Sequence, residues 1–221
     1  MKGFELPFSL IPIASANILI HSKVRINLLS WDSTGEKIKY LLSQIFYSEK
    51  MSIEKIINEA TSKELGKQLG KAITDGNVKA TKRVINEIMK LPDIDLKHIN
   101  AFSSEVVGII CGQLEVYKVP INNIEKKLNK NEKKVKSWLI KSVNRLASID
   151  KKQEIEEEQK NKLLKASSKI LAILEEAIIE KSKQFSEEDK KEVEKIVSHI
   201  KEIEEEIKNI IKNKKFSDIR E

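Results

Sequence analysis

The sequence predicts a mainly all-α fold, and three observations support this prediction. The chain of 221 residues has only seven Gly and four Pro, which is few for a turn-rich β protein. Lys, Glu, Ile and Leu are abundant, which favours long helices. An apolar content of 40% is enough to build a core. We expect short helical repeats that lead into a helix-turn-helix, followed by a long C-terminal helical hairpin.

The first half of the chain carries apolar residues at helical spacing between clear breaks. Asp32 or Ser33 can cap a first helix, and Ser52 can cap a second. Asp75-Gly76 and Pro92-Asp93 mark later breaks. The expected helices carry the apolar residues of segments 38–46 and 53–57 and then cover residues 62–74, 77–91 and 96–116. Residues 36–97 form the helical repeats, and residues 1–35 are a separate N-terminal segment without an assigned role.

The middle of the chain has the pattern of a helix-turn-helix. Ile121, Ile124 and Leu128 recur on one helical face, and a second apolar stripe begins at Val135, after an Asn-rich break at residues 129–132. The run that ends in Ser148, Ile149 and Asp150 fits the first strand of a wing, so residues 98–150 are expected to form a winged helix. Such a unit has two common uses, reading nucleic acid and docking into a multi-subunit complex.

Residues 151–221 predict a helical hairpin. Its helices are expected at about residues 156–183 and 187–212, and Ser186 can cap the second. Apolar residues of the second helix alternate at spacings of 3 and 4, which is a heptad seam. The seam predicts either contact with partner helices or a hairpin that folds back on itself, a common motif that needs no partner. The residues expected to bind partners are Ile196, Ile200, Ile203, Ile207 and Ile210, together with Ser148, Ile149 and Asp150 at the wing.

Basic residues are concentrated in the helix-turn-helix. Residues 151–221 carry 17 basic and 18 acidic side chains, which leaves 24 and 16 for residues 1–150. Nine basic residues and two acidic ones lie between Lys118 and Arg145. Such a patch either neutralises phosphates of DNA or RNA in a salt-dependent way or is an ordinary solvated lysine face. In the first case the residues that face the groove or the phosphates are Lys133, Lys134, Ser137 and Lys141.

Nothing in the sequence predicts catalysis, a metal site or a cofactor. His21, His98 and His199 are scattered, without carboxylates or cysteines at ligand spacing. There is no phosphate-binding glycine loop and no nucleophile elbow. The single cysteine, Cys111, excludes an internal disulfide and favours a reducing intracellular compartment, cytoplasmic or nuclear. No apolar run reaches the ~18 residues of a membrane helix, so we expect a soluble protein that is not an enzyme.

The order of these motifs resembles the PCI domain, the scaffold module of the proteasome lid, the COP-nine signalosome and eukaryotic initiation factor three. The resemblance covers residues 36–150. It is carried by Leu96-Lys97-His98-Ile99, by Val119-Pro120-Ile121-Asn122-Asn123-Ile124, by segment 135–143 and by Ser148-Ile149-Asp150. The family implies that the winged helix pairs with the winged helix of another subunit and that the C-terminal helices enter a bundle of several subunits.

The resemblance implies a non-catalytic scaffold subunit of a large complex. In overall length the chain is most similar to a signalosome subunit, which would place it in the removal of a ubiquitin-like protein from cullins; a subunit of initiation factor three is an alternative. The alternative from another class is a nucleic-acid-binding helix-turn-helix protein that dimerises through a C-terminal coiled coil. The chain departs from the family after Asp150, where residues 151–157 lack the alternation of a second wing strand and an extra helix follows.

Overall fold

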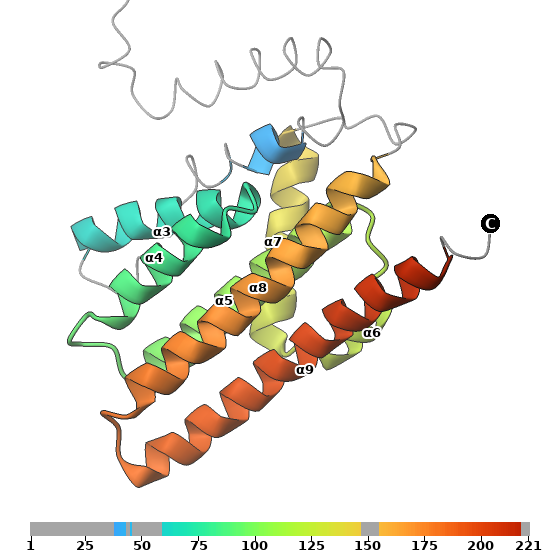
Figure 1. Cartoon of the computed structure of the whole chain (residues 1–221). Helices are drawn as coiled ribbons and strands as arrows, with labels where there is room; N and C mark the ends of the chain where they lie inside the picture. The colour runs from blue at the N-terminus through green and yellow to red at the C-terminus, as the bar shows by residue number, and fades with distance from the viewer. Residues whose placement is uncertain (1–37, 43–44, 46–58, 147–154, 218–221) are drawn as a thin grey trace, which may run out of the picture.

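The structure is a computed structural model that describes residues 38–42, 45, 59–146 and 155–217. These residues form helices and connecting turns and contain no strand, which confirms the predicted all-α class (Figure 1). Residues 38–42 are helical. The labelled helices are α3 (Glu59–Thr74), α4 (Val78–Met89), α5 (Leu96–Val116), α6 (Asn122–Lys127), α7 (Lys130–Leu146), α8 (Glu157–Ser182) and α9 (Glu187–Ser217).

Local capping chemistry explains why several helix ends agree with the sequence pattern. The side chain of Asn77 accepts a hydrogen bond from the backbone N–H of Ala80 and begins α4, just after Gly76 turns the chain with a φ of +62°. Asp95 caps α5, and Ser186 caps α9 by accepting a hydrogen bond of 3.1 Å from the backbone N–H of Asp189. The bounds of α5 are those predicted from the sequence.

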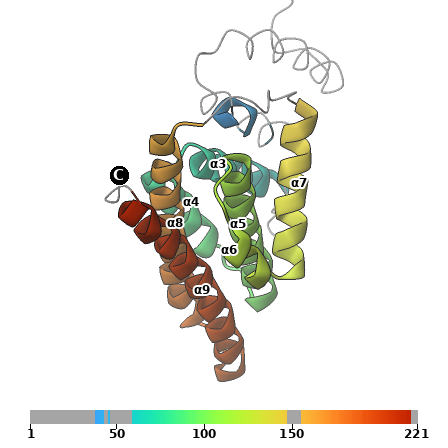
Figure 2. The same ribbon diagram turned by 90° about the vertical axis from the view of Figure 1, so that its right-hand side faces the viewer.

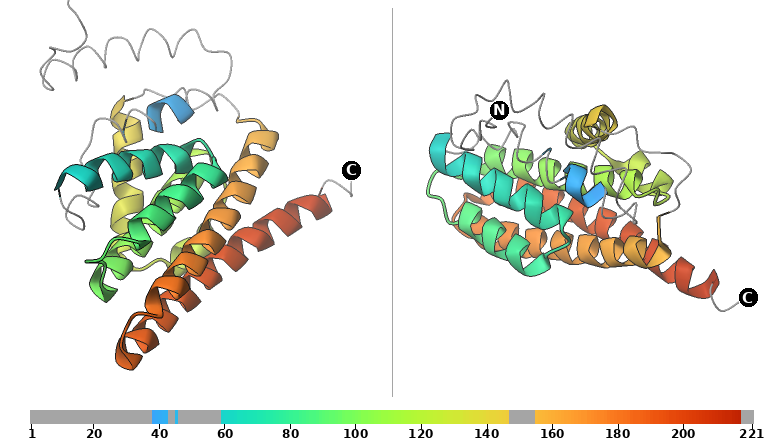
Figure 3. Two further views of the ribbon diagram at one scale, coloured as in Figure 1. Left: turned by 60° about the vertical axis from the view of Figure 1, so that its left-hand side comes forward. Right: turned by 90° about the horizontal axis from the view of Figure 1, so that it is seen from above.

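The helices pack into one body around α5. Helices α3, α7, α8 and α9 all contact α5, while α4 packs against both α3 and α8. Helices α8 and α9 lie side by side as the predicted hairpin (Figures 1 and 3). The buried apolar residues, from Ile38 to Ile207, form a single cluster. The C-terminal hairpin therefore shares its core with the helices that precede it.

The heptad seam of α9 packs inside the chain, which corrects its assignment as a partner-binding surface. Ile200, Ile203 and Ile207 are at most 1% exposed, while Ile196 and Ile210 are half-buried against the same cluster. Helix α9 contacts α8, α5 and α6, so the seam already has its packing partners. Of the two alternatives that the pattern left open, the hairpin that folds back on its own chain is the one observed.

Helices α6 and α7 occupy the place of the predicted helix-turn-helix, with two differences. Helix α6 has only six residues and packs against α9, whereas the main partner of α7 is α5. Helix α7 begins at Lys130, within the expected Asn-rich break. The predicted wing residues, Ser148, Ile149 and Asp150, and the helix expected at residues 53–57 lie outside the described residues.

Candidate nucleic-acid interface

A stripe of basic and small polar side chains runs along the outer face of α7. At about 100° per residue, its members fall within roughly one third of the helix circumference. All are exposed except Ser137, which is half-buried, and none is acidic. We call this surface the α7 stripe; it consists of Lys130, Lys133, Lys134, Ser137, Lys141, Asn144 and Arg145.

The opposite face of α7 packs on α5 at short distance, because two glycines of α5 lie at the contact. A Cβ on Gly108 would lie 2.7 Å from the Cβ of Val135 and 2.9 Å from the carbonyl oxygen of Glu132. A Cβ on Gly112 would lie 2.9 Å from Cδ2 of Leu139, a side chain that is fully buried. Helix α7 stands at the edge of the bundle beside α5 (Figure 2). The stripe therefore faces away from the core.

A capping box fixes the first turn of α7. The Oδ1 atom of Asn129 accepts hydrogen bonds from the backbone N–H groups of Asn131 (2.9 Å) and Glu132 (3.0 Å). In return, Oε2 of Glu132 accepts a hydrogen bond of 2.8 Å from the backbone N–H of Asn129. The reciprocal bonds explain why the helix begins at Lys130, and they bring Lys130 into the stripe.

The carboxylate of Glu132 is also bound to a histidine of α9. His199 Nε2 lies 2.9 Å from Oε1 of Glu132, which is only 1% exposed. The hydrogen bond to this carboxylate raises the pKa of His199 above its ordinary value; burial opposes the shift, and the charge of Glu202 adds to it. The pair connects α9 to the beginning of α7. It also keeps the carboxylate of Glu132 buried, away from the outer face of α7.

This pair predicts a pH-dependent contribution to stability. Because the pKa of His199 is higher in the folded than in the unfolded chain, its contribution is fully present below the unfolded pKa of about 6.5 and is lost as the pH rises through the folded pKa. His199→Gln should therefore lower the free energy of unfolding by roughly 1–2 kcal/mol near pH 6, and by less near pH 8.5. Urea denaturation of both proteins across this range measures the difference. A difference that stays constant with pH would contradict the assignment.

Lys136 points into the bundle, although it is one of the nine basic residues of this segment. It is 7% exposed, and its Nζ atom donates hydrogen bonds to Glu115 of α5 (2.8 Å) and Glu125 of α6 (2.5 Å). Burial opposes its charge, but these two carboxylates raise the pKa of Lys136 above its ordinary value. The bond to Lys136 lowers the pKa of Glu125. One buried lysine thus pairs with two half-exposed carboxylates, whose combined charge exceeds its own by one, and does not belong to the outward patch.

The α7 stripe contains no acidic residue of its own, and one acidic neighbour in its segment, Glu125, interacts with Lys133 while it is hydrogen-bonded to Lys136. Between residues 115 and 146 the sequence contains three acidic residues, Glu115, Glu125 and Glu132. The first two bind Lys136, and the third binds His199. Five cationic side chains remain on the stripe.

The four predicted nucleic-acid contacts come together on this surface. Lys133, Lys134 and Lys141 are exposed, and Ser137 lies half-buried between them along the helix. Of the other members of the stripe, Lys130 and Arg145 belong to the nine basic residues counted in the sequence but were not predicted as contacts, and Asn144 was missed. The helical period identifies them once the beginning of α7 is known, and Asn129 followed by Glu132 three residues later was the signal for that beginning.

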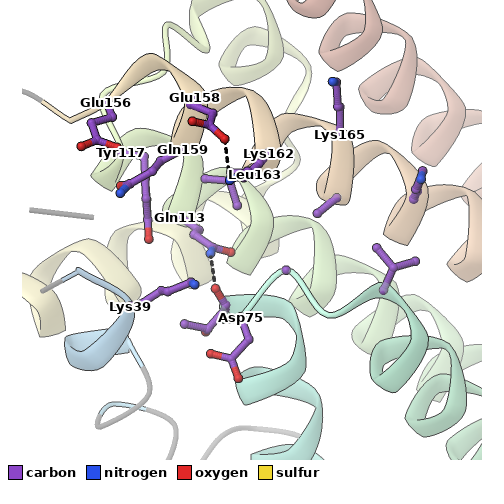
Figure 4. Close-up of a pocket in the computed structure, with 15 residues that line it drawn as sticks. Lys39, Asp75, Gln113, Tyr117, Glu156, Glu158, Gln159, Lys162, Leu163 and Lys165 are labelled. Atoms are coloured by element: carbon purple, nitrogen blue, oxygen red, sulfur yellow. Dashed lines mark hydrogen bonds and ion pairs between the residues drawn. The ribbon is translucent and has the colours of Figure 1, made fainter. Parts of the chain in front are cut away.

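A hollow of about 500 Å³ lies elsewhere, between α8 and the connection of α3 to α4 (Figure 4). The buried side chain of Gln113 lines this hollow, and its Nε2 atom donates a hydrogen bond of 3.1 Å to the backbone carbonyl oxygen of Thr74. Lys162 and Glu158, which also line the hollow, form an ion pair of 2.7 Å. Its charges are mixed and partly paired, in contrast to those of the stripe.

Within the described ranges, no three His, Cys, Asp or Glu side chains gather in a way that would hold a metal ion. His98 pairs with Asp95 at 2.7 Å in the cap of α5, and His199 pairs with Glu132. Sequence analysis missed the second pair because its members are 67 residues apart. Among the helices that the structure describes, none combines the length and the apolar character needed to cross a membrane.

Comparisons of the chain with models of protein families, with curated proteins and with solved structures find no match. The resemblance to the PCI domain therefore stays a prediction. The geometry of the α7 stripe is the basis for the function proposed below.

Proposed function

We propose that this protein binds nucleic acid through the α7 stripe. The observation that carries the proposal is the gathering of five cations and no acidic residue on one exposed helix face, while Glu115 and Glu125 bind Lys136 and Glu132 binds His199. Nucleic acid is the polyanion that such a surface suits, because each phosphate neutralised by Lys or Arg releases condensed counterions. From Lys130 to Arg145 the stripe extends over about 22 Å, long enough to face several phosphates at once.

The contacts that hold α7 in place favour nucleic-acid binding by the stripe. Helix α7 is held along its length by contact with α5 at Gly108 and Gly112, by the capping box at Asn129, and by the ion pairs of Lys136. A rigid helix presents its lysines in fixed register, so the backbone has no ordering cost when a ligand binds. Only the side chains of the stripe then have to be immobilised.

The proposal predicts a loss of affinity when the stripe is neutralised. The triple variant Lys133→Gln, Lys134→Gln, Lys141→Gln removes three of the five charges and should weaken binding to a duplex of about 24 base pairs by ~100-fold at 100 mM salt. The slope of log K against log salt should fall from about −4.5 to about −2. Fluorescence anisotropy with the full chain measures both quantities.

A matched control distinguishes the effect of losing the stripe from the effect of lowering the net charge of the protein. Lys79, Lys82 and Lys90 are exposed on or directly after α4, whose main packing partners are α3 and α8. Changing these three residues to Gln removes the same charge and should alter affinity by no more than ~3-fold, because counterion release depends on contacts. Equal losses in the two triple variants, or a wild-type chain that does not bind at physiological salt, would remove the proposal.

A non-catalytic scaffold subunit of a multi-subunit complex is the second candidate. The all-helical architecture is compatible with it, and so is the order of motifs that resembles a PCI domain. Its partner surface would have to lie elsewhere than the seam of α9, which is buried. Affinity purification of the tagged chain from its native cell, followed by mass spectrometry, tests this role. Stable partners of the lid, signalosome or initiation-factor type would favour the scaffold over the nucleic-acid binder.

A further inference from the structure

We infer that the ligand of the α7 stripe is B-form duplex DNA, with α7 in the major groove and contacts made mainly to phosphates. The inference rests on the proposed function and adds to it the class of nucleic acid and the mode of contact. It follows from the shape of the surface, from the kinds of side chain on it and from the place of its smallest residue.

The shape of the surface favours a groove as its partner. Helix α7 lies at the edge of the bundle beside α5 (Figure 2). It packs on α5 with one face, and the residues of the stripe on its other face are exposed, except for the half-buried Ser137. An α-helix with its side chains is about 10–12 Å wide, and the major groove of B-form DNA, about 12 Å wide, admits it. The major groove of A-form RNA is deep and narrow and excludes side chains. A projecting helix therefore fits duplex DNA better than duplex RNA.

The side chains of the stripe disfavour a single strand as the ligand. Proteins that bind single strands without sequence preference combine a basic groove with aromatic side chains on which the bases stack. None of the seven residues of the stripe is aromatic. Trp138, beside the stripe, is half-buried and packs against the hydrophobic cluster. A single strand would therefore meet cationic side chains on the stripe, but no aromatic side chain of the stripe on which its bases could stack.

The same side chains indicate contacts with phosphates more than with bases. Lysine is a point charge that suits phosphate oxygens, whereas recognition of base edges relies on the paired hydrogen bonds of Arg, Asn or Gln. On the stripe only Asn144 and Arg145 can make such pairs, and both lie in the last turn of α7. Phosphate contacts carry no direct sequence information. Duplexes of equal length and different sequence are therefore expected to bind alike.

The centre of the stripe is small and uncharged. Ser137 lies midway between Lys130 and Arg145, with charged residues toward both ends of the helix. When a helix enters a groove, its central outward residue comes closest to the floor, while flanking lysines reach the phosphates on the two walls. A serine at this position lets the backbone approach without a long side chain in between.

Comparison of several ligands tests the inference. The full chain is titrated at 100 mM salt with two DNA duplexes of different sequence, an RNA duplex and single-stranded DNA, each of about 24 nucleotides per strand, and with phosphatidylserine vesicles. We expect the DNA duplex to bind at least ~10-fold more tightly than either competitor, and two DNA duplexes of different sequence to agree within ~3-fold. Single-stranded DNA or RNA duplex binding as tightly as duplex DNA would overturn the inference and leave the proposed function in place. Binding to none of them, or only to phosphatidylserine vesicles, would overturn both.

A steric probe at the centre of the stripe tests groove entry without changing charge. Cys111 is fully buried, and burial raises the pKa of its thiol far above its ordinary value, so a bulky neutral maleimide should label Ser137→Cys at the introduced thiol alone. The labelled protein should bind duplex DNA at least ~10-fold more weakly than before labelling. Labelled Ser198→Cys, on an exposed position of α9, is the control and should keep its affinity. Unchanged binding by labelled Ser137→Cys, with a normal thermal melt, would exclude α7 from the groove.

Discussion

Replacement of Ile203 by Asp is expected to unfold most of the bundle instead of releasing a partner from it. Ile203 is fully buried in the seam of α9, within the single hydrophobic cluster. An aspartate at this position lacks the buried apolar surface of the isoleucine. Its carboxyl group also has to be protonated or to stay charged and unpaired in the core. The combined cost is about 5 kcal/mol or more, which approaches the whole stability of an ordinary domain. Circular dichroism during urea denaturation measures the loss.

A carboxylate on the outer face of the same helix provides the control. Ser198 is exposed on α9 and lies five residues before Ile203. Ser198→Asp should shift the free energy of unfolding by no more than about 0.5 kcal/mol. If Ile203→Asp unfolded no more easily than Ser198→Asp, the seam would not be packed as the structure has it, and a role in partner binding would return.

The second large effect is expected at the contact between α5 and α7. Gly108→Ala adds a methyl group where the nearest atoms would be 2.7 Å and 2.9 Å away, the Cβ of Val135 and the carbonyl oxygen of Glu132. Neither atom belongs to the flexible end of a side chain, so α7 itself has to move. We expect a net loss of about 2 kcal/mol, because overpacking costs more than the ~1 kcal/mol that Ala gains in helix propensity. Thermal or urea denaturation gives the value.

Gly112→Ala is the matched comparison, one turn further along α5. Its added methyl group would come closest to Cδ2 of Leu139, at 2.9 Å, and a leucine terminus can rotate away. Gly112→Ala should therefore cost at least about 1 kcal/mol less than Gly108→Ala. The reverse order would mean that α7 adapts more easily at its first turns than at its middle. Gly108→Ala should also weaken nucleic-acid binding if α7 has to be fixed for this function.

The elements of this fold could be predicted from the sequence where the signal is local. Asn77, Asp95 and Ser186 act as helix caps, and their bonds reach only three residues along the chain. The bounds of α5 and the existence of the α8–α9 hairpin follow from such caps and from the helical period of the apolar residues. Lys133, Lys134, Ser137 and Lys141 were identified in the same way, because a shared helix face is a property of spacing alone.

What the sequence could not provide depends on contacts between distant segments. The heptad period of Ile200, Ile203 and Ile207 shows that a stripe is buried, but it contains no information on whether the covering helix belongs to the same chain. The pairing of His199 with Glu132 spans 67 residues and has no signature in spacing. The Gly108-x-x-x-Gly112 pair was a visible signal of close helix approach inside an apolar helix, and it was overlooked.

Lys136 has one more consequence, which concerns the chemistry of the lysine side chains themselves. Acylating reagents attack the neutral amine, and an ammonium group that is buried and hydrogen-bonded to Glu115 and Glu125 loses its proton less readily than an exposed one. Lys136 is therefore an unreactive internal standard within a helix whose outer lysines are accessible. In a protection experiment, modification of Lys133, Lys134 and Lys141 would report occupancy of the surface, while modification of Lys136 would report opening of the bundle.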